Sequence, residues 1–596
     1  MSTAILTGQP VPGSSIEGDL RSLGFEVRIA SGTADAETLL AEVPCADRVA
    51  LVDARFVGHP HALRLGLTDP RFPLAAVPGA VTAQASGRQE LTRALARERS
   101  AEAAVLIDSL PDRVLTALTD DGATVHRPEL GTLVAEVPAD PQARNEARQS
   151  VAAVDDEAVR LKSAVKARDG FFTTFCVSPY SRYLARWCAR RGLTPNQVTT
   201  ASLLTALIAA ACAATGTRGG FAAAGVLLIA SFVLDCTDGQ LARYSLQYST
   251  LGAWLDATFD RAKEYAYYAG LALGAARGGD DVWALALGAM VLQTCRHVVD
   301  FSFNEANHDA TANTSPTAAL SDKLDSVGWT VWVRRMIVLP IGERWAMIAL
   351  LTAFTTPRIT FYALLIGCAF AATYTTAGRV LRSLTRKARR TDRAAQALAD
   401  LADNGPLARC VARITRVRLG SPLLVAGAGT AVLAVSLFSG VTWAPVAGAL
   451  VYAITAGQAL YRPLKGALDW LVPPLFRAAE YGTVLVLAVK AEVNGALPAA
   501  FGLVAAVAYH HYDTVYRIRG NAGAPPAWLV RTAGGQEGRV LLVTLLAALL
   551  TGDAFALALT ALAVAVALVV VAESVRFWVA SHRAGAPAVH DEGEPA

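Results

Sequence analysis

Four carboxylates inside otherwise apolar segments constrain this chain more than any other feature of its sequence. Asp235 and Asp238 are three residues apart, and Asp256 and Asp260 are four residues apart. If both segments are helical, each pair lies on one helix face. An acid inside a membrane helix is costly and is functional by default. Four anions that converge on one point require cations, and carboxylate oxygens suit a pair of hard divalent ions.

The composition is that of a membrane protein. Hydrophobic residues make up 53% of the 596 residues, and the mean hydropathy is +0.36. The eight Cys are scattered without a C-x2-C pair, which predicts reduced structural thiols rather than disulfides or a zinc site. No secretory signal is expected, because the segment after Met1 has neither a basic region nor a long apolar core.

Residues 1–150 are expected to form a soluble α/β domain, because strand-like runs at 4–7, 24–29 and 48–53 alternate with helix-like runs at 37–42 and 89–97. After it, apolar runs predict two groups of six membrane helices. The first group covers 198–215, 221–241, 250–277, 281–303, 344–357 and 359–381. The second covers 421–439, 441–461, 469–489, 496–513, 538–551 and 553–580. A strongly basic segment, 379–418, separates the groups, and such segments normally stay in the cytoplasm.

The four acids belong to a longer pattern, D-x2-D-G-x2-A-R-x8-G-x3-D-x3-D, with Gly239, Ala242, Arg243 and Gly252 at its other fixed positions. This pattern resembles the signature of the CDP-alcohol phosphotransferase family at every fixed position. Upstream, the runs K-A-R-D-G at 166–170, S-R at 181–182 and L-T-P-N-Q-V-T at 193–199 resemble the juxtamembrane helix and first-span entry of that family. The likeness is greatest to the branch that makes inositol phosphodiesters, as in phosphatidylinositol-phosphate synthases.

The resemblance implies a role for each matched residue. Asp235, Asp238, Asp256 and Asp260 would hold two divalent ions, Mg2+ or Mn2+, and Asp260 would also be the general base. The base would deprotonate an acceptor hydroxyl that attacks the β-phosphorus of a CDP-alcohol and expels CMP. The CDP moiety would be bound by the residues around the acids: Asn196, Gly239, Ala242, Arg243 and Gly252. Here the glycines would allow close backbone approach, Arg243 would pair with phosphate or with the acids, and Ala242 would serve helix packing.

Candidates for the acceptor site are the basic residues near the signature. Arg261 and Lys263 follow Asp260 directly, and Arg296 and His297 lie in the fourth predicted span. Arg334 and Arg335, in the loop before the fifth span, are weaker candidates, since lipid phosphate contact or membrane topology explains them equally well. The family implies no nucleic-acid partner.

The predicted architecture is therefore an α-helical integral membrane protein with a soluble N-terminal α/β domain. It consists of the α/β domain (1–150), a connector and juxtamembrane helix (151–196), a catalytic six-helix bundle (197–381), a basic cytoplasmic linker (382–418), a second six-helix domain (419–582) and a disordered tail (583–596). We expect a multi-pass protein of the plasma membrane, with the N-terminal domain and the active site on the cytoplasmic side. The N-terminal domain has no recognisable Gly-rich phosphate loop with a basic partner, which favours a degenerate or regulatory domain. An active nucleotidyltransferase that uses other residues is the alternative.

The second group of spans is predicted to be a decayed copy of the first. Aligning the two places Ala453 and Ala456 at the positions of Asp235 and Asp238, and Phe476 at that of Asp260, while Asp469 matches Asp256. Such a half lacks the metal pair and would supply an internal pseudo-dimer interface, in a family that normally forms homodimers. Its remaining polar residues, among them Arg477, Glu480, His510, His511, Asp513 and Arg517, form either an interhelical network, a second ligand site or a metal site.

The favoured function is a transferase that joins a CDP-alcohol to an acceptor alcohol, a polyol or polyol phosphate, with release of CMP. Either substrate could carry the lipid. Two other classes stay open at this point: a transporter or flippase, which two related helical halves would suit, and an inactive scaffold.

Overall fold

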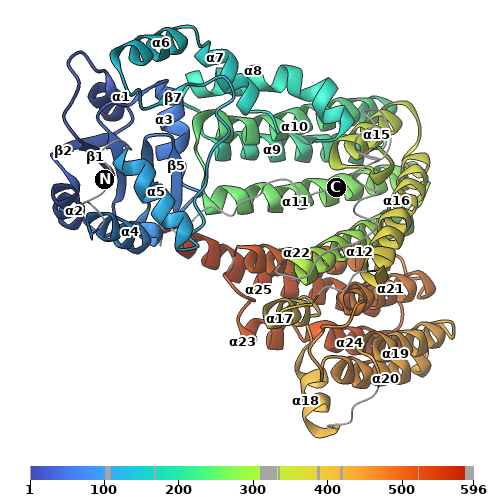
Figure 1. The fold of residues 1–596 in the computed structure, drawn as a ribbon. Helices are drawn as coiled ribbons and strands as arrows, with labels where there is room; N and C mark the ends of the chain where they lie inside the picture. Colours follow the sequence, from blue (N-terminus) through green and yellow to red (C-terminus); the bar gives the residue numbers. More distant parts are fainter. Residues whose placement is uncertain are drawn as a thin grey trace.

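The protein, described here from a computed structural model, is mostly helical with one α/β domain at its N-terminus (Figure 1), as the sequence predicts. The structure describes residues 2–100, 109–166, 169–308, 332, 336–385, 389–415, 420–520 and 522–583. The predicted tail, Arg334, Arg335 and most of the loop before the fifth span lie outside these residues. We call helices α9 to α16 the first membrane half and helices α19 to α25 the second membrane half.

The N-terminal domain is built on a five-stranded sheet of order β2-β1-β3-β6-β5. Strands β1 (Ser2–Thr7), β2 (Phe25–Ala30) and β3 (Arg48–Asp53) are parallel, and they coincide with the predicted strand runs. Strands β5 (Leu74–Val77) and β6 (Ala80–Ala83) form an antiparallel hairpin that pairs with β3. The sequence analysis did not predict this hairpin.

Helices cover both faces of this sheet. Alternate residues of a strand face opposite sides, so Ile5 packs with α2 (Thr33–Glu42), α4 (Arg88–Ser100) and α5 (Leu110–Asp120). Its neighbour Leu6 packs with α1 (Ile16–Ser22) and α3 (Pro60–Leu67). The result is a three-layer domain, followed by the connector helices α6 (Pro141–Ala152), α7 (Asp156–Ser163) and α8 (Ser178–Arg190).

A helix lies over each span predicted for the first membrane half. The helices are α9 (Pro195–Ala214), α10 (Arg218–Ser245), α11 (Thr250–Arg277), α12 (Trp283–Asn307), α15 (Ile341–Phe354) and α16 (Pro357–Thr385). The T-P-N run explains where α9 begins. The Thr194 hydroxyl accepts from the Gln197 N–H, the Gln197 side chain accepts from the Thr194 N–H, and Pro195 takes the first helical position.

The basic segment between the halves is partly helical and partly buried. It contains α17 (Asp392–Leu401) and α18 (Pro406–Thr415). Leu398 and Leu401 on α17 are fully buried, and the helix packs against α12 of the first half. This apolar face was not recognised in the sequence because the segment is short and strongly basic. Packing of neighbouring helices buries the face.

The second membrane half also has a helix over each predicted span. Its long helices are α19 (Pro422–Leu437), α20 (Trp443–Ala459), α21 (Val472–Lys490), α22 (Ala496–Arg519), α24 (Gly535–Leu549) and α25 (Asp553–Arg583), with the short α23 (Ala527–Thr532) before α24. Packed helix pairs repeat along the chain when α8 is counted with the first half and α18 with the second. The pairs α8–α10, α10–α15 and α12–α16 correspond to α18–α20, α20–α24 and α22–α25.

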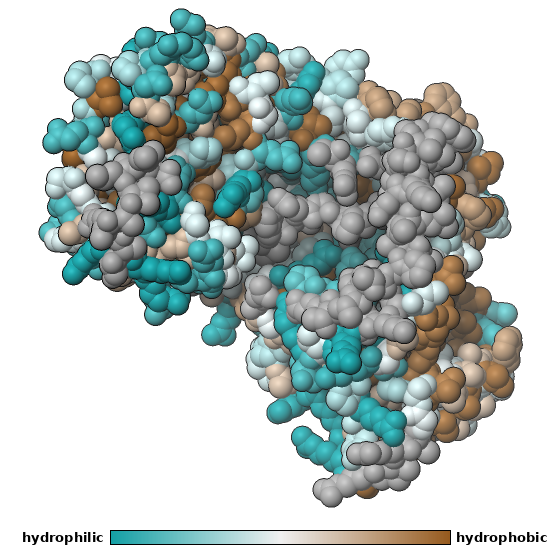
Figure 2. All heavy atoms as spheres, in the orientation of Figure 1, coloured by the Kyte–Doolittle hydropathy of each residue, from teal (hydrophilic) through white to brown (hydrophobic). Residues whose placement is uncertain are grey.

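Five of the described helices are long and apolar enough to cross a membrane: α9, α10, α16, the α21 segment and α25. Charged and polar side chains lower the hydropathy of α11, α12 and α22, which are the helices that pack at the junction of the two halves. Figure 2 shows apolar surface gathered over the membrane helices at the right, whereas the face of the N-terminal domain is largely hydrophilic. The chain is a membrane protein with a polar domain attached.

Candidate active site

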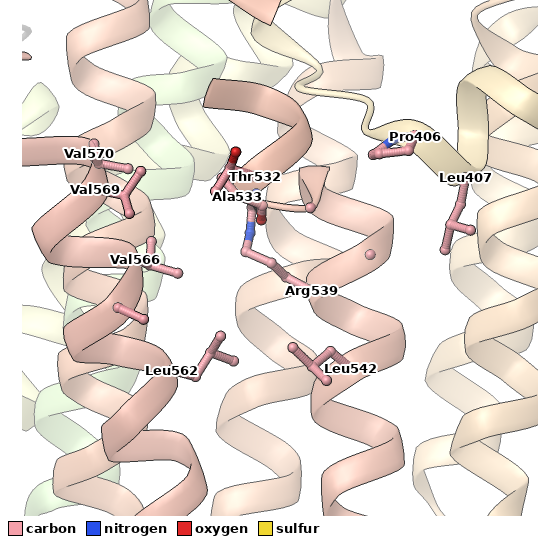
Figure 3. Close-up of a pocket in the computed structure, with 13 residues that line it drawn as sticks. Pro406, Leu407, Thr532, Ala533, Arg539, Leu542, Leu562, Val566, Val569 and Val570 are labelled. Atoms are coloured by element: carbon pink, nitrogen blue, oxygen red, sulfur yellow. Dashed lines mark hydrogen bonds between the residues drawn. The ribbon is translucent and has the colours of Figure 1, made fainter. Parts of the chain in front are cut away.

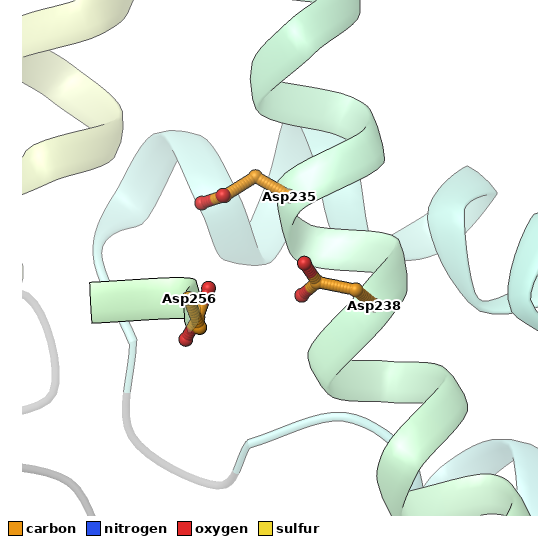
Figure 4. A group of neighbouring side chains, drawn as sticks. All are labelled: Asp235, Asp238 and Asp256. Carbon is orange, nitrogen blue, oxygen red and sulfur yellow. The ribbon is translucent and has the colours of Figure 1, made fainter. Parts of the chain in front are cut away.

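The signature acids come together where α10 ends and α11 begins. Leu246 adopts a left-handed conformation with φ of 50° and ends α10, and the Ser249 hydroxyl accepts from the Gly252 N–H at 2.9 Å to begin α11. This short turn places Asp235 and Asp238 of α10 opposite Asp256 of α11. Their carboxyl groups face a common space (Figure 4), with ligand oxygens of all three within 4.8 Å of one another.

These three acids fit a divalent cation. Carboxylate oxygens are the ligands that Mg2+ and Mn2+ prefer. Asp238 is 4% exposed, and its Oδ2 atom is buried without a hydrogen-bond partner among the described residues. Three acids packed so closely repel one another unless positive charge lies between them. The donor set and the orphaned oxygen therefore match a cation bound between α10 and α11.

The fourth acid, Asp260, has a partner of its own. Lys263 is fully buried, and its ammonium lies 2.8 Å from Asp260 Oδ1 and also contacts Asp235. It donates a further hydrogen bond to the Ser202 hydroxyl at 3.2 Å. A buried ammonium needs such partners because desolvation is costly. Lys263, which the sequence analysis placed among the acceptor ligands, thus lies inside the acid cluster and links its two sides.

Two of the residues expected at CDP contact each other. A Cβ atom on Gly252 would lie 2.7 Å from Asn196 Oδ1 and 2.8 Å from the Ser249 hydroxyl, so a larger residue here would require those side chains to move. Gly239 has no such restriction, since a Cβ atom built there would lie 3.5 Å from the Arg243 guanidinium, an ordinary contact distance. Arg243 itself donates to the Ala164 carbonyl at 2.6 Å and so ties the connector to α10. Ala242 is half-buried, and its carbonyl accepts the N–H of Gln247 in the turn.

The N-terminal domain contacts this turn. Arg64 of α3 donates to the Ser245 carbonyl at 2.6 Å, and the Arg71 guanidinium lies over the Tyr248 ring at 4.1 Å. Burial raises the pKa of the Tyr248 phenol. The N-terminal domain thus contacts the residues that join the two signature helices.

The other acceptor candidates line the opposite side of α11. Arg261 pairs with Glu264 at 2.9 Å, and its guanidinium lies 3.3 Å from His297 Nδ1. Arg296 is 7% exposed and donates to the Val338 carbonyl, while its Nε and Nη1 atoms have no partner among the described residues. Arg261 thus contacts His297, and Arg296 directly precedes His297 on α12.

Sequence reasoning missed three residues of this network. Glu264 is 2% exposed and binds Arg261, Arg344 and the Tyr268 hydroxyl. An acid three residues after a basic one is a recognisable signal for Glu264. Arg344 contacts Glu264 but lies 80 residues away in the chain, so no local pattern predicts the pair. Tyr512 comes from the second membrane half, and no local pattern marks it as part of this site.

The second membrane half contains the same ionic framework without the acid cluster. Arg477 and Glu480 pair at 2.7 Å and Arg539 joins Glu480 at 2.5 Å, as Arg261, Glu264 and Arg344 do in the first half. Asp403, between α17 and α18, lies 2.7 Å from Arg539. Burial alone would raise the pKa of Asp403, but Arg539 and Arg477 outweigh it and hold that pKa well below its usual value.

A cavity of about 350 Å3 also lies in the second half (Figure 3). It opens between α18, α24 and α25, and its lining is apolar except for Thr532 and Arg539. Because Arg539 is already bound to Glu480, Asp403 and the Ala533 carbonyl, the cavity offers no free charged group. It does not reach the acid cluster between α10 and α11.

The fold and the site define a helical membrane protein with a partly buried carboxylate cluster suited to a divalent cation. Residues 192–377 match the model of the CDP-alcohol phosphatidyltransferase family, and residues 392–596 match a family of unknown function, DUF5941. This match confirms the resemblance to the CDP-alcohol phosphatidyltransferase family that was inferred from the sequence.

Two relatives support the same family and branch. The chain is 36% identical over 131 residues to the phosphatidylinositol phosphate synthase of Streptomyces avermitilis, covering 21% of this chain and 51% of that protein. It is 31% identical over 114 residues to the bifunctional IPC transferase and DIPP synthase of Aquifex aeolicus, covering 19% of this chain and 26% of that protein. The chain thus spans about half and a quarter of the length of these relatives.

Replacing one acid should weaken the binding of Mg2+, which tests the cation site directly. We expect Mg2+ to raise the melting temperature of the wild-type protein, and Asp238→Asn to raise the concentration needed for half the effect by at least about tenfold, since a ligand oxygen is lost. Asp469→Asn is the matched control, because Asp469 is the one aligned acid of the second half. A control variant with the same weakened response would contradict a cation site confined to the first half.

Proposed function

We propose that the protein is a membrane transferase that forms a phosphodiester from a CDP-alcohol and an acceptor alcohol and releases CMP. The observation that carries this proposal is the convergence of Asp235, Asp238 and Asp256 within 4.8 Å on the family signature. A scaffold without activity has no need to bring three partly or fully buried acids to one point, because each costs free energy there. A transporter would not need the glycine at position 252, which fits closely against Asn196.

Asp260 is proposed as the general base. The neighbouring Lys263 ammonium stabilises the carboxylate form, which is the form that accepts a proton. From this position Asp260 takes the proton of the acceptor hydroxyl, whose oxygen attacks the β-phosphorus, and the bond to CMP breaks. Two bound Mg2+ or Mn2+ ions would supply charge stabilisation for the pyrophosphate and the developing negative charge. Asn196, Gly239, Ala242, Arg243 and Gly252 are proposed to shape the place for CDP.

The substrates are proposed from the relatives and from the charges near Asp260. One relative is named for making phosphatidylinositol phosphate and the other for di-inositol phosphate chemistry. Arg261, Arg296 and His297 give this chain a basic group that suits a phosphorylated polyol. We therefore propose a polyol phosphate as one substrate, with the lipid on either the donor or the acceptor.

The second membrane half is proposed to be a copy that has lost catalysis. Its helix pairs and its Arg477–Glu480–Arg539 group match those of the first half. Ala453, Ala456 and Phe476 stand where the alignment requires three of the acids. We further propose that the active site faces the cytoplasm at the plasma membrane, where the basic segment between the halves would remain.

The direct test is CMP release by the purified full chain in nanodiscs with Mg2+. CDP-diacylglycerol and CDP-inositol are each offered with a panel of polyols and polyol phosphates. We expect CMP with one donor only, and its dependence on the partner alcohol identifies the acceptor. If neither donor yields CMP while the protein binds CDP with Mg2+, the donor alcohol is a different one. If CDP does not bind, the proposed function is wrong.

A further inference from the structure

Helix α11 has two working faces. Asp256, Asp260 and Lys263 recur at four and three residues and so share the face toward α10. Trp254, Arg261 and Tyr265 recur at seven and four residues and share the opposite face. That second face meets the second membrane half, because α11 packs on α22 and α25 (Figure 1). Helix α11, which carries Asp256 and Asp260, therefore packs on its opposite face against the second membrane half, in the region that matches DUF5941.

Tyr512 of α22 makes the most direct of these contacts. Its hydroxyl lies 2.5 Å from His297 Nδ1, and its ring lies under the Arg261 guanidinium at 5.5 Å. The other ring nitrogen of His297 is 2.7 Å from the Gln293 amide nitrogen. The imidazole is thus fixed at both nitrogens, once from its own helix and once from the second half. Tyr512 is 3% exposed, so water does not replace its hydroxyl easily.

Trp578 of α25 holds the beginning of α11. Its indole stacks on Trp254 with ring centroids 6.1 Å apart, two residues before Asp256. The indole N–H donates to Asp513 Oδ1 at 2.7 Å, and the Ser574 hydroxyl donates to the same oxygen at 2.6 Å. Asp513 also pairs with Arg517 at 2.8 Å. Part of the polar network of the second half therefore serves to orient a side chain against the catalytic helix.

We propose that the second membrane half completes the active site, with Tyr512 as a positioning residue for the acceptor. Tyr512 fixes His297 and Arg261, and Arg261 directly follows the proposed base Asp260. This inference rests on the proposed function. Tyr512 itself touches neither the acids nor the CDP residues, so its effect should fall on acceptor binding and not on the donor. A role for the second half in the site also explains why a half without the acid cluster keeps a buried polar junction.

The test is the kinetics of Tyr512→Phe in the full chain in nanodiscs, with the KM of each substrate measured separately. We expect the acceptor KM to rise about five- to tenfold, as for loss of one buried hydrogen bond, with the donor KM and the Mg2+ requirement within about twofold. Tyr452→Phe is the matched control. Tyr452 is also fully buried, and its hydroxyl bonds Gln536 within the second half.

Three kinetic results would overturn the proposal. The acceptor KM of Tyr512→Phe could match the wild type, both KM values could rise together, or Tyr452→Phe could show the same change. Melting temperatures of the two variants, measured alongside, show whether a general loss of packing produces the effect.

A binding measurement separates this inference from the proposed function. If the wild type neither releases CMP nor binds CDP, the proposed function fails, and calorimetry with inositol 1-phosphate still tests Tyr512. Binding that is weakened in Tyr512→Phe but not in Tyr452→Phe would support the positioning role. No binding by the wild type, or equal binding by both variants, would overturn it.

Discussion

Replacing Asp260 by Asn is expected to lower CMP release by about 1,000-fold or more, while the protein stays folded. The change keeps the size of the side chain but removes the basic oxygen that takes the proton, and general base catalysis alone contributes 100- to 10,000-fold. Asn also weakens the contact with the Lys263 ammonium, which is 2.8 Å from the carboxylate. The measurement is the initial rate of CMP formation at saturating donor and acceptor.

Asp280→Asn is the control for this variant. Asp280 lies in the turn after α11 and pairs with Arg358 at the surface, so its loss should leave the rate within about twofold. An Asp260→Asn protein that keeps a tenth or more of the wild-type rate would show that another group accepts the proton. CDP binding by the variant distinguishes a lost base from a lost donor site.

Replacing Lys263 by Met is expected to make the stability of the protein depend on Mg2+. The ammonium is fully buried and bridges Asp235 and Asp260, so its removal leaves acids facing one another without compensation. Breaking a buried ion pair by removing one partner costs about 3–5 kcal/mol. A bound cation can replace the missing positive charge. We therefore expect a lower melting temperature without Mg2+ and substantial recovery with it.

Lys490→Met provides the comparison. Lys490 is exposed at the end of α21 and donates to the Phe438 carbonyl, far from the acids in sequence. Its variant should melt close to the wild type with or without Mg2+. If Lys263→Met melts like the wild type in the absence of Mg2+, then Lys263 does not neutralise the acid cluster.

Much of the fold could be predicted because the signals were local. Each predicted span has a helix, since a run of apolar residues long enough to cross a membrane leaves few other structures open to it. The T-P-N run marks the start of α9, and β1, β2 and β3 match the predicted runs. The antiparallel β5–β6 hairpin and the buried face of α17 were missed, because both are short and depend on their neighbours for burial.

The candidate site divides in the same way. Spacing put Asp235 and Asp238 on one helix face and Asp256 and Asp260 on another, and predicted that all four converge. The structure brings Asp235, Asp238 and Asp256 together. Spacing could not show that Lys263 turns inward between Asp235 and Asp260. Lys263 was a candidate for binding acceptor phosphate because it follows Asp260 closely in the sequence. In the structure its buried ammonium contacts Asp235 and Asp260, because a buried cation needs anionic partners.

The sequence by itself determined the acids, their spacing and the helices that carry them, because these depend on residue type and on helical periodicity. Only the tertiary structure decided how the two halves meet. Tyr512 and His297 are 215 residues apart in the chain, yet their side chains lie 2.5 Å apart. No periodic pattern encodes such a contact. It arises when α11 and α12 pack on α22 and α25, and burial of the junction makes its hydrogen bonds costly to lose.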